Sequence, residues 1–279
     1  MGRTVHLSCS NLAWPPDQTP AALELLSSLG VQGVEVAPTR LPCPPAEYRN
    51  QVADAGLAVS SLQAILHKRP DLQLFGDMLL LRDHFARMAE VAHALGAGVM
   101  VFGAPANRRR GNLPLGVAWD RAVAKLRSLA DAAHGVVIGL EPVPEIYGGD
   151  FLTHWFEVWK MVREVDRPGL RVHLDTACVD LAGDSIGTAI RDSADVLAHY
   201  HASQPDLGDF KAPLSAHWEA AEALEEVRYQ GWMAIEMRQQ PDWRRAIARA
   251  VSVLSRAAST ARTLPPPSSP TGSSQPTSC

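Results

Sequence analysis

The chain has 279 residues, of which 46% are hydrophobic and 20% are charged, and its formal net charge at pH 7 is -4. This composition is typical of a globular protein and excludes the collagen-like, disordered and coiled-coil classes. The acidic balance argues against binding of nucleic acid, which requires a basic face, and no apolar run approaches the ~20 residues that a membrane span needs.

Short β-rich runs alternate with longer amphipathic runs along the chain. The expected strands cover residues 4–8, 33–37, 57–66, 98–103, 136–141, 170–175, 196–201 and 231–236. The expected helices cover residues 20–30, 45–55, 78–95, 116–133, 153–165, 185–193, 214–227 and 241–258. Strict alternation of short apolar strands with helices indicates parallel βαβ units.

Eight such units in about 260 residues match the size of a (β/α)8 TIM barrel. The alternative is a doubly wound open sheet, which usually has a glycine-rich fingerprint after its first strand. Residues 8–12, with the sequence SCSNL, contain no glycine. We therefore predict a single barrel domain over residues 1–261. The Pro- and Ser-rich residues 262–279 cannot bury a core and are expected to form a disordered tail.

Polar residues stand at the ends of four consecutive expected strands, where a TIM barrel carries its chemistry. They are Glu141, Asp175, His201 and Glu236, each about one βα unit after the previous one. Three carboxylates in one place repel one another unless a cation neutralises them, so the set predicts a divalent metal ion. Any single acid at a strand end could instead cap a helix or pair with arginine, but four at this spacing favour the metal site.

Two histidines precede these ligands by two residues each. Because side chains alternate along a strand, His173 and His199 should face the barrel interior one layer below, with Gly139 and Ala234. Metal ligands need orienting partners, so we expect both histidines to pack in the core or orient ligands rather than to bind the ion.

Five segments in this order resemble the xylose isomerase-like TIM-barrel family. They are GVEVA (33–37), GLEP (139–142), HLDT (173–176), HYHAS (199–203) and AIE (234–236). The family contains tagatose 3-epimerase-type sugar epimerases, hydroxypyruvate isomerases and endonuclease IV. In its epimerase branch, the resemblance implies, Glu141, Asp175, His201 and Glu236 hold one divalent ion, most often Mn²⁺, with Mg²⁺, Co²⁺ or Zn²⁺ as alternatives. It also implies that Glu141 and Glu236 move protons.

The implied function is a metal-dependent isomerase or epimerase that moves a proton next to the carbonyl of a sugar or sugar derivative, through an enediolate. Two positions depart from the family pattern: Cys178 replaces a frequent histidine and Gln204 replaces a frequent acid. Endonuclease IV-like sites need several more histidines for three zinc ions. His67 could supply one, but Cys178 replaces another, which argues against DNA repair.

Substrate-binding candidates surround the expected site. Glu35 and His67 end the second and third strands, Tyr147 lies in the loop after the fifth strand, and Arg238 follows the eighth. Each can form hydrogen bonds to a hydroxyl or carboxylate. The run of arginines at 108–110 could bind a phosphate, but short charge runs usually face water, so a solvated loop is the favoured interpretation.

Other functions remain compatible with the same residues. A lyase or dehydratase would use similar metal chemistry on a keto-sugar or keto acid, and a barrel without activity would be a binding protein. All four ligand types are present, which counts against the last. The scattered cysteines and the absence of an apolar leader predict reduced thiols in the cytoplasm. The expected partner is a small sugar or sugar derivative, and the chain is compatible with a homo-oligomer.

Overall fold

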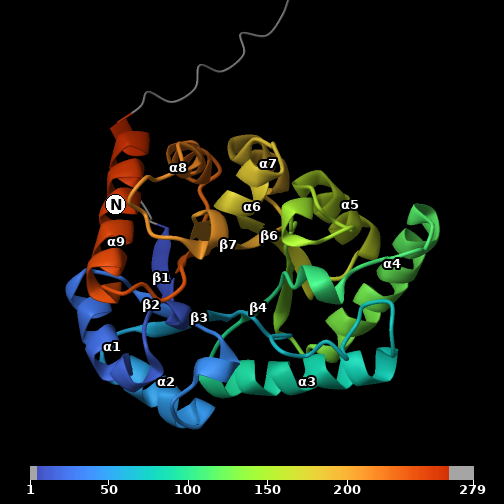
Figure 1. Ribbon diagram of the computed structural model, residues 1–279, viewed down its shortest axis with the longest axis horizontal. Coiled ribbons are helices and arrows are strands. Elements are labelled where there is room, and N and C mark those ends of the chain that lie inside the picture. The colour runs from blue at the N-terminus through green and yellow to red at the C-terminus, as the bar shows by residue number, and fades with distance from the viewer. Residues whose placement is uncertain (1–4, 264–279) are drawn as a thin grey trace, which may run out of the picture.

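The computed structural model describes residues 5–263 and contains a closed barrel of eight parallel strands, β1 to β8 in chain order (Figure 1). This confirms the predicted fold class. The strands are β1 (His6–Ser10), β2 (Gly33–Val36), β3 (Ala58–Leu62), β4 (Val99–Phe102), β5 (Val137–Leu140), β6 (Leu170–Asp175), β7 (Leu197–Ser203) and β8 (Trp232–Glu236). The barrel closes because β1 pairs with both β2 and β8.

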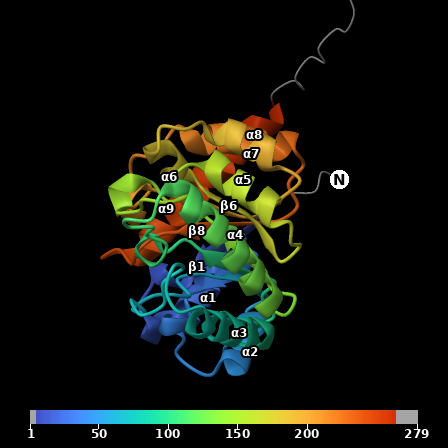
Figure 2. The same cartoon turned by 90° about the vertical axis from the view of Figure 1, so that its right-hand side faces the viewer.

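Helices form an outer layer around the strands, as Figures 1 and 2 show from two directions. They are α1 (Thr19–Ser28), α2 (Pro45–Asp54), α3 (Met78–Leu95), α4 (Leu115–Ala132), α5 (Trp155–Val165), α6 (Thr176–Leu181), α7 (Ile186–Ser193), α8 (Ala216–Glu226) and α9 (Trp243–Thr263). Within residues 5–263, no helix combines the length and apolar character needed to cross a membrane.

Local sequence signals set the ends of α3 at the predicted residues. The Asp77 side chain accepts hydrogen bonds from the backbone N–H groups of Leu79 and Leu80, which caps the first turn. Gly96 ends the helix with φ of 77°, a left-handed conformation that glycine adopts without steric cost.

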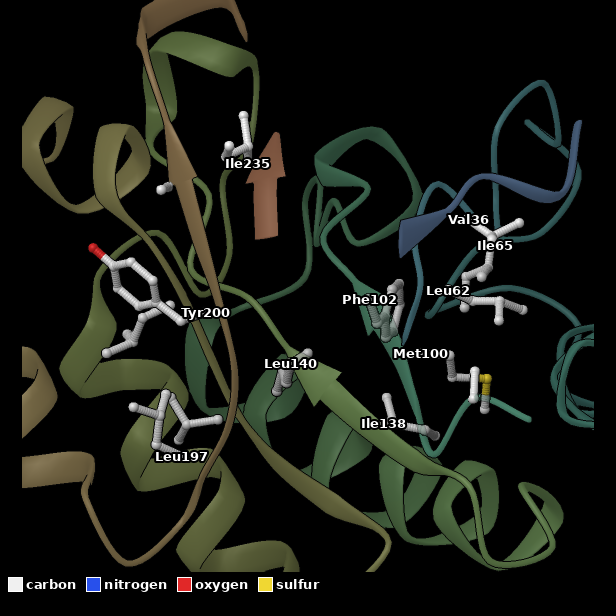
Figure 3. Close-up of a cluster of buried hydrophobic side chains, with 14 of the residues drawn as sticks. Val36, Leu62, Ile65, Met100, Phe102, Ile138, Leu140, Leu197, Tyr200 and Ile235 are labelled. Carbon is white, nitrogen blue, oxygen red and sulfur yellow. The ribbon is translucent and has the colours of Figure 1, made fainter. Parts of the chain in front are cut away.

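The hydrophobic core lies between the strands and the helices. Met100 and Phe102 of β4 are in register with Ile138 and Leu140 of β5, and all four are buried side by side (Figure 3). Tyr200 packs in this core. Because side chains alternate along β7, its neighbours on either side project into the barrel instead. Packing of the core therefore aims the polar residues of the strands at the barrel interior.

Several elements differ from the sequence prediction, among them β7, which continues to Ser203 beyond its predicted end at 201. Helix α6 was not expected, and it begins directly after β6, where the Asp175 side chain accepts a hydrogen bond from the Cys178 N–H. Strand β3 ends at Leu62, so His67 lies in the following loop rather than at a strand end. Helix α9 continues to Thr263, beyond the predicted domain boundary at 261. The remainder of the predicted tail, from 264, lies outside the described residues.

Candidate metal centre

The four predicted ligands meet at the carboxyl end of the barrel. Asp175 ends β6, Glu236 ends β8 and Glu141 directly follows β5. His201 lies inside β7, two residues before its end, and is in register with Asp175. Ligand atoms of Glu141, Asp175 and His201 lie within 4.8 Å of one another, and Nδ1 of His201 lies 3.2 Å from Oε2 of Glu236. These separations suit side chains that share one ion.

Hydrogen bonds fix the Asp175 carboxylate through one of its two oxygens and leave the other oxygen without a partner among the described residues. Its Oδ1 accepts from the Ser203 hydroxyl at 2.8 Å and from the Cys178 N–H at 2.7 Å. Its Oδ2 is buried and has no hydrogen-bond partner among the residues that the structure describes. Nδ1 of His201 is buried as well, and its contact with Oε2 of Glu236 at 3.2 Å does not have the geometry of a hydrogen bond. Buried acceptors without a partner are costly, so these two atoms fit the donor set of a metal ion.

Glu35 of β2 lies below the ligands. Its Oε1 is 2.9 Å from Nε2 of His201, 2.9 Å from Nε2 of His199 and 2.8 Å from the Ser61 hydroxyl, which donates to it. An Nε2–H of His201 that donates to Glu35 leaves Nδ1 free to bind an ion, the arrangement typical of metal-ligating histidines. The sequence predicted that Glu35 contacts the substrate, but its side chain has no exposed surface and lies against His199 and His201. We therefore expect it to orient His201.

The crowding of charged groups changes their proton affinities. Burial, together with the charge of Asp175, raises the pKa of Glu141 to about 8. Burial also raises the pKa of Asp175, and Glu236 adds to this effect. Burial opposes protonation of His201, but the charges of Glu35 and Glu236 outweigh it and raise the His201 pKa well above its usual value. In the metal-free protein, protons therefore neutralise part of this cluster, which a divalent cation would do when bound.

His173 and His199 are fully buried, and each precedes a ligand residue by two positions in its strand. Their rings stack with centroids 5.3 Å apart. Burial lowers the pKa of both, which favours neutral imidazoles. Nitrogens of these two side chains and of His201 also lie within 4.8 Å of one another. Nε2 of His199 and Nε2 of His201 both contact Glu35, so His199 and Glu35 form a buried layer next to the candidate ligand His201.

A glycine that the sequence interpretation left without a role makes space for Glu141. A Cβ atom at Gly103, directly after β4, would collide with Oε2 of Glu141. The carboxylate therefore occupies the space that a side chain at position 103 would fill. The sequence signal that could have indicated this role is Gly103 itself, since a glycine at the end of a strand often marks the close approach of another group.

Two cavities share lining residues with the candidate ligand cluster. A cavity of about 700 Å³ is lined by Glu141, His201 and Glu236 and by two predicted substrate contacts, His67 and Arg238. A smaller space of about 290 Å³ shares Glu141, Glu236 and Arg238 and is also lined by Tyr147 and Cys178. The volume of the larger cavity lies within the range of small-molecule sites. His67, Tyr147 and Arg238 thus face cavities that adjoin the ligands.

The run of arginines after β4 is solvated only in part: Arg109 is exposed and Arg110 is half-buried, but Arg108 is buried. Arg108 is 1% exposed, and its guanidinium carbon lies 5.6 Å from the centre of the Phe102 ring. Burial lowers the pKa of Arg108 to about 10, although the charge of Glu141 opposes this shift. Arg109 donates to the carbonyl of Gly148, and the backbone N–H of Arg110 donates to Asp150. The run therefore joins the loops that follow β4 and β5.

The fold is a TIM barrel, and its carboxyl end carries a cluster of Glu, Asp and His side chains that could hold a metal ion. A family model described as xylose isomerase-like TIM barrel matches residues 23–257. The chain belongs to this family, which confirms the resemblance seen in its sequence.

Known relatives include several sugar epimerases. A D-psicose 3-epimerase of Ruminiclostridium cellulolyticum is 32% identical over 124 residues, which are 42% of this chain and 41% of that protein, so the match spans less than half of the relative. The structure of an L-ribulose 3-epimerase has a TM-score of 0.79 at 17% identity and covers 93% of this chain and 96% of its own. A 3-keto-D-glucoside 4-epimerase from E. coli has a TM-score of 0.72 at 18% identity, with 91% and 100% covered. At these identities the two structures show a shared fold.

Proposed function

We propose that this protein is a metal-dependent epimerase or isomerase that moves a proton on a carbon next to the carbonyl group of a sugar. The observation that carries the proposal is the cluster of Glu141, Asp175, His201 and Glu236 beneath a cavity large enough for a sugar. The partial relative named as a D-psicose 3-epimerase supports the sugar as substrate. We propose Mn²⁺ as the ion, because three carboxylates and one imidazole form an oxygen-rich donor set.

The bound ion would supply positive charge where negative charge develops on the substrate oxygens. Two glutamates then transfer the substrate proton. Glu141 follows β5 and Glu236 ends β8, so their carboxylates come from strands that are not neighbours and approach the cavity from different sides. One carboxylate takes the proton from carbon and the other returns a proton to the opposite face, which inverts that carbon. Asp175, held by Ser203 and the Cys178 N–H, acts as a ligand only.

Proton exchange measured by NMR in D₂O tests this function. Metal-loaded protein is incubated with D-psicose, D-tagatose and a panel of other ketoses, and the expected result is deuterium at one carbon together with the epimeric sugar. Replacement of Mn²⁺ by Mg²⁺, Co²⁺ or Zn²⁺ compares the candidate ions. Absence of exchange on every sugar, with metal bound, would contradict the proposal, and loss of water from the substrate would point to a lyase.

The variants Glu141→Gln and Glu236→Gln test the glutamate pair. Each amide keeps an oxygen, but it cannot accept the substrate proton, so turnover should fall by about 100-fold or more, the usual scale for general acid–base catalysis. Metal content is measured in parallel, because loss of the ion would mimic loss of the base. Glu90→Gln, at an exposed position of α3, is the matched control. Full turnover by both site variants with metal retained would leave the glutamates as ligands only.

A further inference from the structure

The larger cavity has two chemically different sides. Its metal side carries Glu141, His201 and Glu236, which come from the arc of strands between β5 and β8. Its other side carries three cationic side chains that have no part in the ligand cluster. Arg40 ends the short 3-10 helix after β2, Lys68 lies in the loop after β3, and Arg238 is two residues beyond β8. Since β8, β1, β2 and β3 are neighbours in the barrel, these cations occupy one continuous arc of the rim.

Within the described part of the chain, no carboxylate forms an ion pair with any of these three cations. The carboxylates among the described lining residues are Glu141 and Glu236, both on the metal side. A chain with a formal net charge of -4 does not gather unpaired cations in one cavity through a general excess of basic residues.

The protein holds Arg40 in a fixed orientation. Its Nη2 donates to the Trp14 carbonyl at 2.6 Å and to Oε1 of Gln239 at 3.4 Å. Its Nε is buried and has no hydrogen-bond partner among the residues in the described part of the chain. The backbone N–H of Arg238 donates to the Leu207 carbonyl at 2.9 Å, which fixes the start of that loop. The arc therefore combines one oriented guanidinium with two exposed cations, Lys68 and Arg238.

We propose that this arc binds the carboxylate or phosphate group of an anionic sugar, while the carbonyl end of the same sugar lies at the metal ligands. The inference rests on the proposed function and narrows its substrate class from sugars in general to sugar acids or sugar phosphates. Lysine and arginine donate charge-assisted hydrogen bonds to both kinds of oxyanion, and an arginine can do so with two parallel bonds.

Equilibrium binding to the metal-loaded protein tests the proposal independently of turnover. The probes are D-fructose, D-fructose 6-phosphate and 2-keto-D-gluconate, titrated calorimetrically at low ionic strength. At least one anion should bind about tenfold to a hundredfold more tightly than D-fructose, the range for one hydrogen bond to a charged group. The two anions separate a phosphate site from a carboxylate site. The preference should weaken as salt is added, because exposed charges are screened.

A double variant identifies the residues responsible. Lys68→Gln with Arg238→Gln should weaken binding of the anion far more than binding of D-fructose, so that most of the preference for the anion is lost. The matched control is Arg82→Gln with Arg228→Gln, which removes two exposed cations that do not line the cavity. Arg40→Gln should reduce the preference further.

The outcomes separate this inference from the proposed function. Equal affinity for all three probes, or a preference for the anion that survives in the double variant, would overturn the anion site. Deuterium exchange on neutral ketoses, with no tighter binding of the corresponding anionic sugars, would also overturn the anion site. The proposed epimerase function would still stand. Tight anion binding that depends on Lys68 and Arg238 would support the site even if no proton exchange were found.

Discussion

Replacement of Glu35 by glutamine removes one negative charge beneath the ligands and leaves the shape of the side chain almost unchanged. The amide oxygen can still accept from Ser61 and from Nε2 of His201, as Oε1 of Glu35 does in the structure. What is lost is the charge that raises the pKa of His201. A histidine without this partner is a weaker base and a weaker ligand.

The expected size of the effect follows from the contacts. Loss of a carboxylate that orients a ligating histidine typically weakens metal binding by about 10-fold to 100-fold, which is about 1.4–2.7 kcal/mol. Oε2 of Glu35 is buried without a partner among the described residues, so the NH₂ group that replaces it becomes a buried donor without an acceptor. This should lower the free energy of unfolding of the metal-free protein by about 1–3 kcal/mol.

Titration with Mn²⁺ in competition with a chelator, at a temperature where both proteins are folded, measures the first effect, and chemical denaturation of the metal-free protein measures the second. Glu90→Gln on the exposed side of α3 should change neither quantity. If Glu35→Gln bound Mn²⁺ within about twofold of the parent protein, the orienting role of Glu35 would be wrong.

Four further predictions concern the candidate ligands and the space around them. The affinity for metal should rise by about tenfold per pH unit for each displaced proton between pH 6 and 8, because Glu141 has a pKa near 8 and His201 a raised one. Over the same interval the metal-free protein should lose stability, since its folded form holds protons that the unfolded chain has released, and denaturation at several pH values measures this. A flat affinity profile would contradict these protonation states. Gly103→Ala should destabilise the protein by about 1–3 kcal/mol and lower its metal content by displacing Glu141, whereas Gly98→Ala, which meets no atom within 4 Å, should do neither. Asp175→Asn and His201→Ala should each abolish metal-dependent stabilisation in thermal unfolding, and unchanged metal stoichiometry in both would refute the ligand assignment.

The four candidate ligands were accessible from sequence because each is a polar residue at or near the end of an apolar strand. Parallel strands of a barrel carry their ends to one rim, so spacing along the chain was enough to bring them together. Glu35 shows the limit of this reasoning. It stands one residue before the end of β2, where a polar side chain was expected to reach substrate, but the structure buries it against His199 and His201.

Residues that act through burial or through loop geometry could not be predicted in the same way. Arg108 belongs to a run of three arginines, and nothing in the sequence distinguishes the one that packs on Phe102 from the two that bond to the neighbouring loop. Arg40 lies in a Pro-rich connection without strand or helix periodicity, so its place in the cavity depends on the path of the loop. Helix α6 was missed because a helix of six residues gives too little periodicity to detect.

The register of β6, β7 and β8 sets the relative heights of the candidate ligands in the barrel. Asp175 is in register with His201, but the residue of β7 that is in register with Glu236 is Ser203, two positions further along. The same Ser203 donates to Asp175. One strand therefore supplies both a ligand and the group that orients its neighbour, at two heights in the barrel. Sequence spacing gives the order of the strands but not their stagger, which hydrogen bonding around the closed sheet sets.

Closure of the barrel is what joins the two sides of the cavity. The candidate ligands come from β5 to β8, and the three cations come from the loops after β8, β2 and β3. In an open sheet with its strands in chain order, β2 and β3 would lie far from β8. Pairing of β1 with β8 brings these arcs around one space. Arg238 directly extends the strand that ends in Glu236, so the transition from metal side to cation side occurs within two residues. A sugar that bridges the sides would place its charged group and its reacting carbon against elements that only the closed barrel holds together.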